Sequence, residues 1–268
     1  MHGLFHTGTA RDDSTFTRLK YLALALAAIG IGAPAANATL IDVQWNPSTT
    51  ANIMTGNAAT GSTDTGSGST AATTDIWNQA TQQSYASTAP LALNDVAGNS
   101  TGVTLAVTGT SGIGNYGGTV NSAPASYFTT NVFPLFDNII YSTSTTPMVT
   151  LTFNGLAAGN YNLFLYSSGD QNSNTRAIGV TANGGGATAG PINIGPSGGA
   201  TAMTSGLNFG ELSQVAVNSS GVLNVNVSSV SGELDVDGLQ LQSVPEPGAL
   251  GLLALGGMGL LSRRRRHA

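Results

Sequence analysis

Two stretches of sequence are most informative about the fold, residues 154–166 (NGLAAGNYNLFLY) and residues 233–241 (ELDVDGLQL). The first predicts a turn that leads into a strand with alternating polar and apolar residues. In the second, Leu234 and Val236 share one face of a strand, whereas Leu239 and Leu241 have the opposite parity. One extra residue at Asp237-Gly238 would return both leucines to the core, so we expect a β-bulge there.

Outward from these stretches, short β-type runs alternate with loops rich in Gly, Asn, Ser and Thr. About eight strands separated by such turn signals predict an all-β antiparallel sandwich or jelly roll over residues 39–243. The predicted strands are residues 40–45, 101–108, 148–153, 161–166, 176–182, 207–217, 222–227 and 233–242. Residues 125–140 could hold a helical turn or two, interrupted by Pro134. Residues 59–74 hold nine Ser/Thr and three Gly, so we expect a flexible loop at about 55–74.

Charge separates the body of the chain from its ends. The whole chain of 268 residues has a net charge of −5 and no cysteine. Between residues 39 and 243, however, Arg176 is the only cation against ten acidic residues, a formal charge of −9. Such a body repels phosphate backbones, which excludes nucleic acid as a partner. Without cysteine, the domain has neither disulfides nor thiolate metal sites.

The N-terminal end has the three parts of a secretory signal peptide. Arg18 and Lys20 precede an apolar run over residues 21–31, and Ala36-Asn37-Ala38 provides an A-x-A cleavage site. We therefore expect residues 1–38 to form a signal helix that signal peptidase removes after Ala38.

The C-terminal end, residues 244–268, also has three parts. Pro245-Glu246-Pro247 is followed by the apolar residues 248–261 and by the cluster Arg263, Arg264, Arg265 and Arg266. Fourteen apolar residues span only about 21 Å as a helix, less than a bilayer core of ~30 Å. The arginines would stop translocation and stay on the cytoplasmic side. We expect a short transmembrane helix that holds the exported body at the inner membrane transiently.

These three C-terminal parts, paired with a signal peptide, resemble the PEP-CTERM sorting signal of Gram-negative bacteria. The resemblance implies that an exosortase recognises Pro245, Glu246 and Pro247 and processes the chain there. It also implies a final location at the cell surface or in the extracellular matrix, in species that make exopolysaccharide.

The body resembles the galactose-binding-like β-sandwich modules of exported bacterial proteins. Besides the two opening stretches, the resemblance rests on Trp45-Asn46 and on Asp75-Ile76-Trp77-Asn78. It implies a jelly-roll fold and carbohydrate binding, and it supplies no catalytic residue.

The residue types in the body exclude most catalytic chemistry. Without His, Cys or Lys between residues 39 and 243, neither a Ser-His-Asp triad nor an imidazole metal site can form there. Paired carboxylates, as in glycosidases, are the remaining option. No spacing singles out a pair among Asp42, Asp75, Asp137, Asp170 and Glu233. We therefore expect no catalytic residue and no enzyme activity.

Two binding sites are predicted from side-chain chemistry. Glu233, Asp235 and Asp237 form either a solvated acidic face or, with oxygen ligands only, a Ca²⁺ site, and no other cofactor is expected. Tyr116, in a glycine-rich loop, and Trp77 are candidate contacts to a sugar ring, although a tryptophan more often packs in a core.

Together these observations predict an exported, exosortase-processed, non-catalytic protein of the cell surface or matrix that associates with exopolysaccharide in a biofilm. The alternative is a lectin-like module with a defined saccharide, stabilised by Ca²⁺. A glycoside hydrolase is the third hypothesis.

Overall fold

The computed structural model describes residues 39–45, 76–80, 90–115, 135, 138–143, 148–167, 176–195 and 204–245. Several predictions lie outside these residues: the signal helix with Ala36 and Ala38, the loop at about 55–74, Tyr116, Glu246, Pro247, the C-terminal helix and Arg263–Arg266. Within the described ranges, no helix combines the length and the apolar character needed to cross a membrane.

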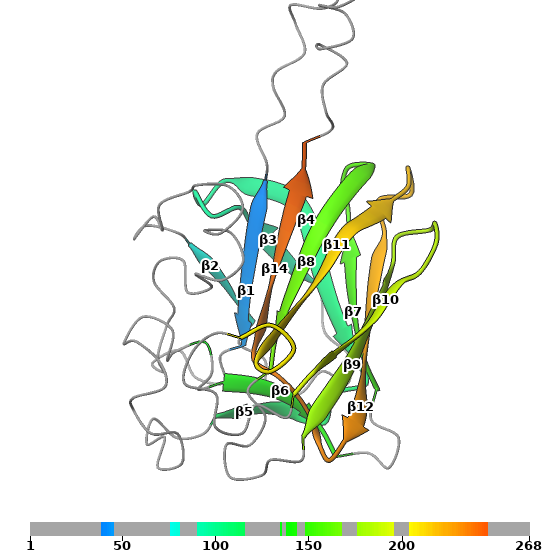
Figure 1. The fold of residues 1–268 in the computed structure, drawn as a ribbon. Helices are drawn as coiled ribbons and strands as arrows, with labels where there is room; N and C mark the ends of the chain where they lie inside the picture. The colour runs from blue at the N-terminus through cyan, green and yellow to red at the C-terminus, as the bar shows by residue number, and fades with distance from the viewer. Residues whose placement is uncertain are drawn as a thin grey trace, which may run out of the picture. The chain divides into compact units, whose positions relative to one another are not determined.

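Two large β-sheets and one small sheet make up the described structure (Figure 1). The five-stranded sheet has the order β11 (Phe209–Val217), β8 (Gly159–Tyr166), β14 (Gly238–Val244), β1 (Leu40–Trp45) and β2 (Trp77–Ala80). The six-stranded sheet has the order β10 (Ala189–Ile194), β9 (Ala177–Asn183), β12 (Leu223–Ser231), β7 (Met148–Asn154), β4 (Ser100–Thr108) and β3 (Leu91–Asn94). The small sheet has the order β13 (Leu234–Val236), β6 (Asn138–Ser142) and β5 (Gly112–Asn115).

Among the described strands, all pairs are antiparallel except β1 with β2, which run parallel. The predicted all-β sandwich is therefore confirmed.

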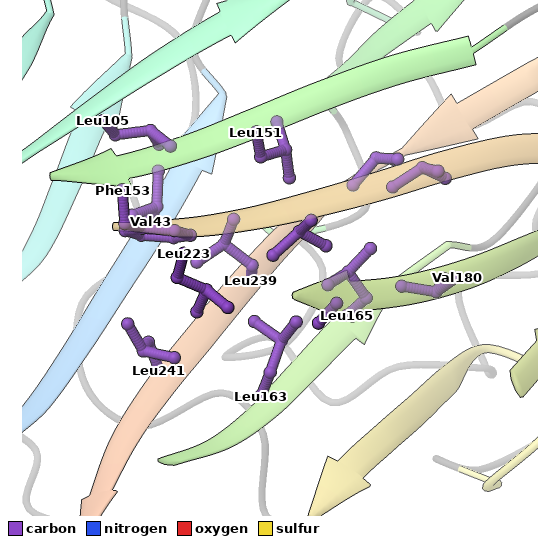
Figure 2. Packing of buried hydrophobic residues seen from close by; sticks show 14 of the residues in the cluster. Val43, Leu105, Leu151, Phe153, Leu163, Leu165, Val180, Leu223, Leu239 and Leu241 are labelled. Atoms are coloured by element: carbon purple, nitrogen blue, oxygen red, sulfur yellow. The ribbon is translucent and has the colours of Figure 1, made fainter. Parts of the chain in front are cut away.

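The core lies between the two large sheets (Figure 2). Alternate residues of β7 and β12 point inward, and they meet the inward residues of β1, β8 and β14. The buried residues that Figure 2 labels on these five strands are Val43, Leu151, Phe153, Leu163, Leu165, Leu223, Leu239 and Leu241. Burying each such side chain contributes roughly 1.5–3 kcal/mol, so the apolar core stabilises a domain that contains no disulfide.

Residues 154–166 form the predicted turn and strand. β7 ends at Asn154, and β8 starts at Gly159. Gly155 has a φ of +86°, and a Cβ there would lie 2.7 Å from the carbonyl oxygen of Gly102, so only glycine fits this turn. The Tyr161 hydroxyl donates to the Ala157 carbonyl at 2.9 Å and ties the turn to β8. Burial raises the pKa of Tyr161, against the opposing effect of this hydrogen bond.

Residues 233–241 follow the predicted burial but not the predicted bulge. Leu234, Val236, Leu239 and Leu241 are all buried. All four are buried because the chain passes from the small sheet to the five-stranded sheet at Asp237. Before this residue β13 pairs with β6, and after it β14 pairs with β8 and β1. The bulge prediction is wrong because the parity change marks a passage between two sheets, not an extra residue within one strand. The backbone N–H of Asp237 donates to the Tyr166 carbonyl at 2.8 Å and fixes the crossing point.

Five short strands were not predicted as strands, namely β2, β3, β5, β6 and β10. Residues 138–140, within the segment expected to hold helical turns, belong to β6. β6 lies between β5 and β13, and pairing on both sides overrides a weak local preference. The helical prediction is therefore wrong for residues 138–140.

Asn78 connects the two large sheets at one edge. Its Nδ2 donates to the carbonyl oxygens of Asp42 at 2.9 Å and Asn94 at 2.8 Å. Its Oδ1 accepts from the backbone N–H of Asn94 at 2.7 Å. Asn78 lies in β2 and Asn94 in β3, so the hydrogen bonds of one buried amide join the edges of the two sheets.

Asp95 organises the loop between β3 and β4. Its Oδ1 accepts from the backbone N–H groups of Ala97 at 3.0 Å and Asn99 at 2.8 Å, and its Oδ2 accepts from the Asn99 side chain at 3.1 Å. Slight burial acts to raise the pKa of Asp95, but the Asn99 and Ala97 hydrogen bonds outweigh it and hold the pKa below its usual value.

This lowered pKa predicts a pH-dependent contribution of Asp95 to stability. Because the folded-state pKa lies below the unfolded-state value, the contribution is fully present above the unfolded-state pKa. It is lost as the pH falls through the folded-state pKa. We expect Asp95→Asn to unfold at lower urea concentration than the wild type at pH 7, with the difference shrinking toward pH 2. A difference that stays constant over this range would contradict the assignment.

Candidate functional site

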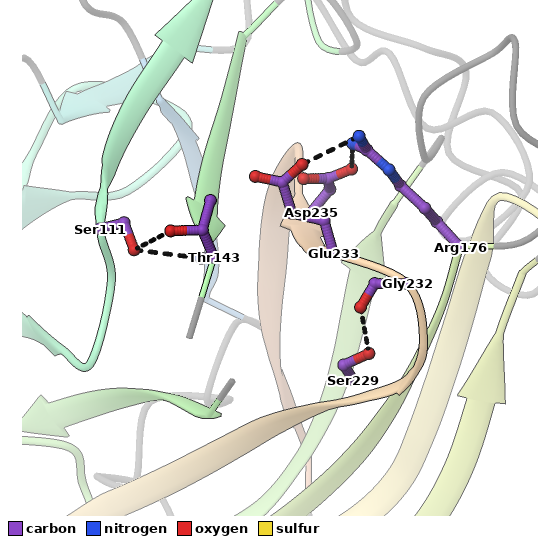
Figure 3. Close-up of polar contacts among 7 residues, drawn as sticks. All are labelled: Ser111, Thr143, Arg176, Ser229, Gly232, Glu233 and Asp235. Atoms are coloured by element: carbon purple, nitrogen blue, oxygen red, sulfur yellow. Dashed lines mark hydrogen bonds and ion pairs between the residues drawn. The ribbon is translucent and has the colours of Figure 1, made fainter. Parts of the chain in front are cut away.

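Arg176 and two acidic residues form an ion-pair cluster beside β9 and β13 (Figure 3). Arg176 directly precedes β9, Glu233 directly precedes β13, and Asp235 lies within β13. The Arg176 Nη2 atom is 2.8 Å from Glu233 Oε2, and Nη1 is 2.5 Å from Asp235 Oδ2. Only 1% of the Asp235 side chain is exposed, against 20% of Arg176 and 26% of Glu233. The only cation of residues 39–243 thus neutralises a buried carboxylate.

The cluster changes the interpretation of Glu233, Asp235 and Asp237. Asp235 and Asp237 are fully buried, so the solvated acidic face expected for these residues is wrong. Glu233 and Asp235 face the guanidinium of Arg176 (Figure 3). Among the residues that the structure describes, no three His, Cys, Asp or Glu side chains are grouped so that they could hold a metal ion. The arrangement gives the Ca²⁺ prediction no support, and it stays a prediction.

A second polar layer is buried on the outer face of the five-stranded sheet. The Tyr166 hydroxyl on β8 donates to Gln240 Oε1 on β14 at 2.7 Å, and Gln240 Nε2 donates to Asp42 Oδ1 on β1 at 3.0 Å. All three side chains are fully buried. A Cβ on Gly238 would lie 2.5 Å from Leu135 Cδ1, so Leu135 covers this face beside Gln240. Asp42 is therefore shut off from an external substrate, although the sequence made it a candidate acid.

The tryptophans lie in the interior. Trp45 is buried within the main core cluster, and Trp77 on β2 has a relative exposure of 4%. The predicted contact of Trp77 with a sugar ring is corrected, because its rings have no open face on the surface. Trp45 packs in the core, as the alternative predicts, whereas Trp77 is buried outside the main core cluster, paired with Asp42 of β1.

The sorting motif follows directly on the last strand. β14 ends at Val244, which pairs with Asn160 of β8. Pro245, the first residue of the predicted motif, is exposed. No linker separates the paired end of β14 from Pro245-Glu246-Pro247 in the sequence.

The sequence interpretation did not join the polar residues of β7 and β12 into one array on the outer face of the six-stranded sheet. Thr150 and Thr152 on β7 each donate a hydroxyl hydrogen bond at 2.9 Å to Oδ1 of Asn226 and Asn224 on β12. The signal was present in the alternation of Thr150-Leu151-Thr152 and of Asn224-Val225-Asn226. Their neighbours across the sheet come from strands distant in sequence, so no single segment revealed the array.

Comparison with known proteins assigns the C-terminus. Residues 243–266 match the family model of the PEP-CTERM protein-sorting motif. The match covers the Pro-Glu-Pro triplet, the apolar segment and the arginine cluster. The chain therefore carries a PEP-CTERM sorting motif, which indicates an exported protein of Gram-negative type that an exosortase processes.

Three of the solved structures to which this chain is similar are carbohydrate-binding modules. A structure of TmCBM61 in complex with β-1,4-galactotriose is 14% identical, with 52% of this chain and 83% of that chain covered and a TM-score of 0.30. A family 35 carbohydrate-binding module from Clostridium thermocellum is 16% identical, with 52% and 92% covered and a TM-score of 0.29. The C-terminal CBM6 of LamC from Zobellia galactanivorans is 13% identical, with 52% and 99% covered and a TM-score of 0.26. No curated protein matches the chain.

Proposed function

We propose that the mature chain is a non-catalytic protein of the cell surface or extracellular matrix that associates with exopolysaccharide in a biofilm. The observation that carries this proposal is the sorting motif, which matches at residues 243–266 and starts at an exposed proline immediately after β14. The body is thus presented outside the cell, and it remains there after an exosortase has acted on the tail.

The side chains of the body support a non-catalytic role. Asp42, Asp235 and Asp237 are buried, and Glu233 is paired with Arg176. A glycosidase needs two carboxyl groups that face a substrate from opposite sides of the scissile bond. These four acidic residues, all within the described ranges, do not form such a pair of substrate-facing carboxyl groups. These contacts support a binding or structural role for the body.

The sorting step is tested by replacing Pro245, Glu246 and Pro247 with alanine in the full chain, expressed in the producing bacterium. Without the motif the exosortase has no recognition sequence, so unprocessed protein should accumulate in the inner membrane. Cell fractionation and mass spectrometry of the C-terminus measure this outcome. Ser213→Ala, an exposed change on β11, is the control that should leave processing unchanged. An alanine variant with the same C-terminus and location as the wild type would overturn the sorting assignment.

A further inference from the structure

The two large sheets differ in what covers their outer faces. On the five-stranded sheet, Asp42, Gln44, Gln240 and Tyr166 point away from the core and are nevertheless fully buried. On the six-stranded sheet, residues 102–108, 148–154 and 223–228 alternate between half-buried or exposed outward residues and buried core residues. The middle of the five-stranded sheet is therefore covered on its outer side, whereas the middle strands of the six-stranded sheet present an accessible outer face.

This face is uncharged. No residue of β3, β4, β7, β9, β10 or β12 is Asp, Glu, Lys or Arg. In an average soluble domain about a quarter of residues are charged, and the outward positions of a half-exposed sheet normally carry many of them. The body carries a net charge of −9, yet the strands of the six-stranded sheet contain no charged residue.

In two rows across the sheet, all outward residues except Ala106 are hydroxyl and amide side chains in register. One row across the sheet consists of Thr108, Thr150, Asn226 and Thr181, and the next consists of Ala106, Thr152, Asn224 and Asn183. Neighbouring strands are about 4.8 Å apart, and successive outward residues on one strand are about 7 Å apart. The Thr150–Asn226 and Thr152–Asn224 hydrogen bonds hold the central side chains in place.

We propose that this neutral face, defined by the outward residues of β4, β7, β12 and β9, binds an uncharged polysaccharide laid across the strands. The inference rests on the proposed association with exopolysaccharide and names its site and ligand class. Threonine hydroxyls and asparagine amides both donate and accept hydrogen bonds, as sugar hydroxyls do. A neutral polymer has no ionic group. Its binding therefore avoids the free-energy cost of removing water from a charge that meets no counter-charge on this face.

The other classes of partner fit this face less well. An anionic polymer meets no cation on these strands, and Arg176 already pairs with Glu233 and Asp235. Protein interfaces concentrate aromatic, Met and Arg residues at their centre. The six strands contain one aromatic residue, Phe153, which is buried in the core. The exposed apolar residues Met148 and Val230 lie in the strands at one end of the face, near Ser228.

Because the contacts are hydrogen bonds on an open surface, each one is weak. A polymer that spans several rows gains affinity from many such contacts at once. After the first contact has formed, the neighbouring sugars are held close to the face, so the further contacts form at a high effective concentration. Short oligosaccharides should therefore bind much more weakly than the polymer from which they derive.

The test is the retardation of the full chain, purified from producing cells, in native gels that contain a neutral polymer or the anionic polymer alginate. The neutral polymers are a β-glucan, a galactan and a mannan. Thr181→Lys and Asn226→Lys each place a charge on the face, and we expect each to weaken retardation by a neutral polymer about tenfold or more. Ser213→Lys adds the same charge on β11 of the other sheet and should change retardation less than about twofold.

Asn226→Lys removes the acceptor for Thr150, whereas Thr181→Lys keeps that hydrogen bond, so thermal unfolding of both variants separates binding from folding.

Equal retardation of Thr181→Lys and Ser213→Lys would overturn the face as the site while the association with polysaccharide stands. Stronger retardation by alginate than by any neutral polymer would overturn the ligand class. Failure of the wild type to be retarded by any of the polymers would overturn both the face and the proposed association. Self-association that both face variants abolish, without retardation, would show that a second copy is the partner and would overturn the proposal.

Discussion

Replacing Arg176 with Met is expected to lower the free energy of unfolding by about 3 kcal/mol, because it leaves the buried Asp235 carboxylate without its counter-charge. Removal of one partner from a buried ion pair typically costs about 3–5 kcal/mol. The lower end of that range applies because the Arg176 side chain keeps one fifth of its surface exposed. Urea unfolding at neutral pH measures the change, and a loss below about 1 kcal/mol would contradict the role given to Arg176.

Two control variants separate the buried pair from the exposed one. Glu233→Gln removes the outer partner, which is 26% exposed, and should cost less than about 1 kcal/mol. In the double variant Arg176→Met with Asp235→Asn, neither charge remains, so its stability should exceed that of Arg176→Met alone. Additive losses in this double-mutant cycle would show that the two residues do not interact.

Replacing Gln240 with Leu is expected to cost about 3 kcal/mol, because one substitution removes two buried hydrogen bonds. Tyr166 loses an acceptor and Asp42 loses a donor, and each such loss in the interior costs about 1–3 kcal/mol. Leucine is close to glutamine in volume, so packing changes add little. The measurement is again urea unfolding at neutral pH.

Tyr166→Phe is the matched control for the Gln240 variant. It removes the donor to Gln240 and leaves the Gln240–Asp42 bond in place, so its expected cost is about 1 kcal/mol. A Gln240→Leu variant as stable as Tyr166→Phe would show that the Asp42 contact contributes nothing.

The sequence predicts those strands whose own residues carry the pattern. β1 was predicted with the observed bounds, Leu40–Trp45, and β7 and β8 follow from their alternation. β2 (WNQA), β5 (GIGN) and β10 (AGPINI) contain few β-branched or aromatic residues, and Pro191 lies within β10. These strands exist because a partner strand pairs with them, and that partner cannot be deduced from four to six residues.

The site was harder to predict, because its contacts join distant residues. The sequence singled out Arg176 as the only cation and Asp235 as one of an acidic trio, yet 59 positions separate the two. Asp42 and Gln240 are 198 positions apart. Strand parity places both on the outer side of their sheet, where the usual expectation is contact with water. Their burial depends on what covers that sheet, which periodicity does not reveal.

The pairing of β1 with β14 sets the order of events during export. β1 is the first described strand and β14 the last, and they lie side by side near the middle of the five-stranded sheet (Figure 1). The sheet cannot close until residues 238–244 have emerged on the same side of the membrane as residues 40–45. Closure over such a sequence separation is slow. A chain from which residues 238–244 have not yet emerged therefore lacks the strand that joins β8 to β1, and its five-stranded sheet stays open.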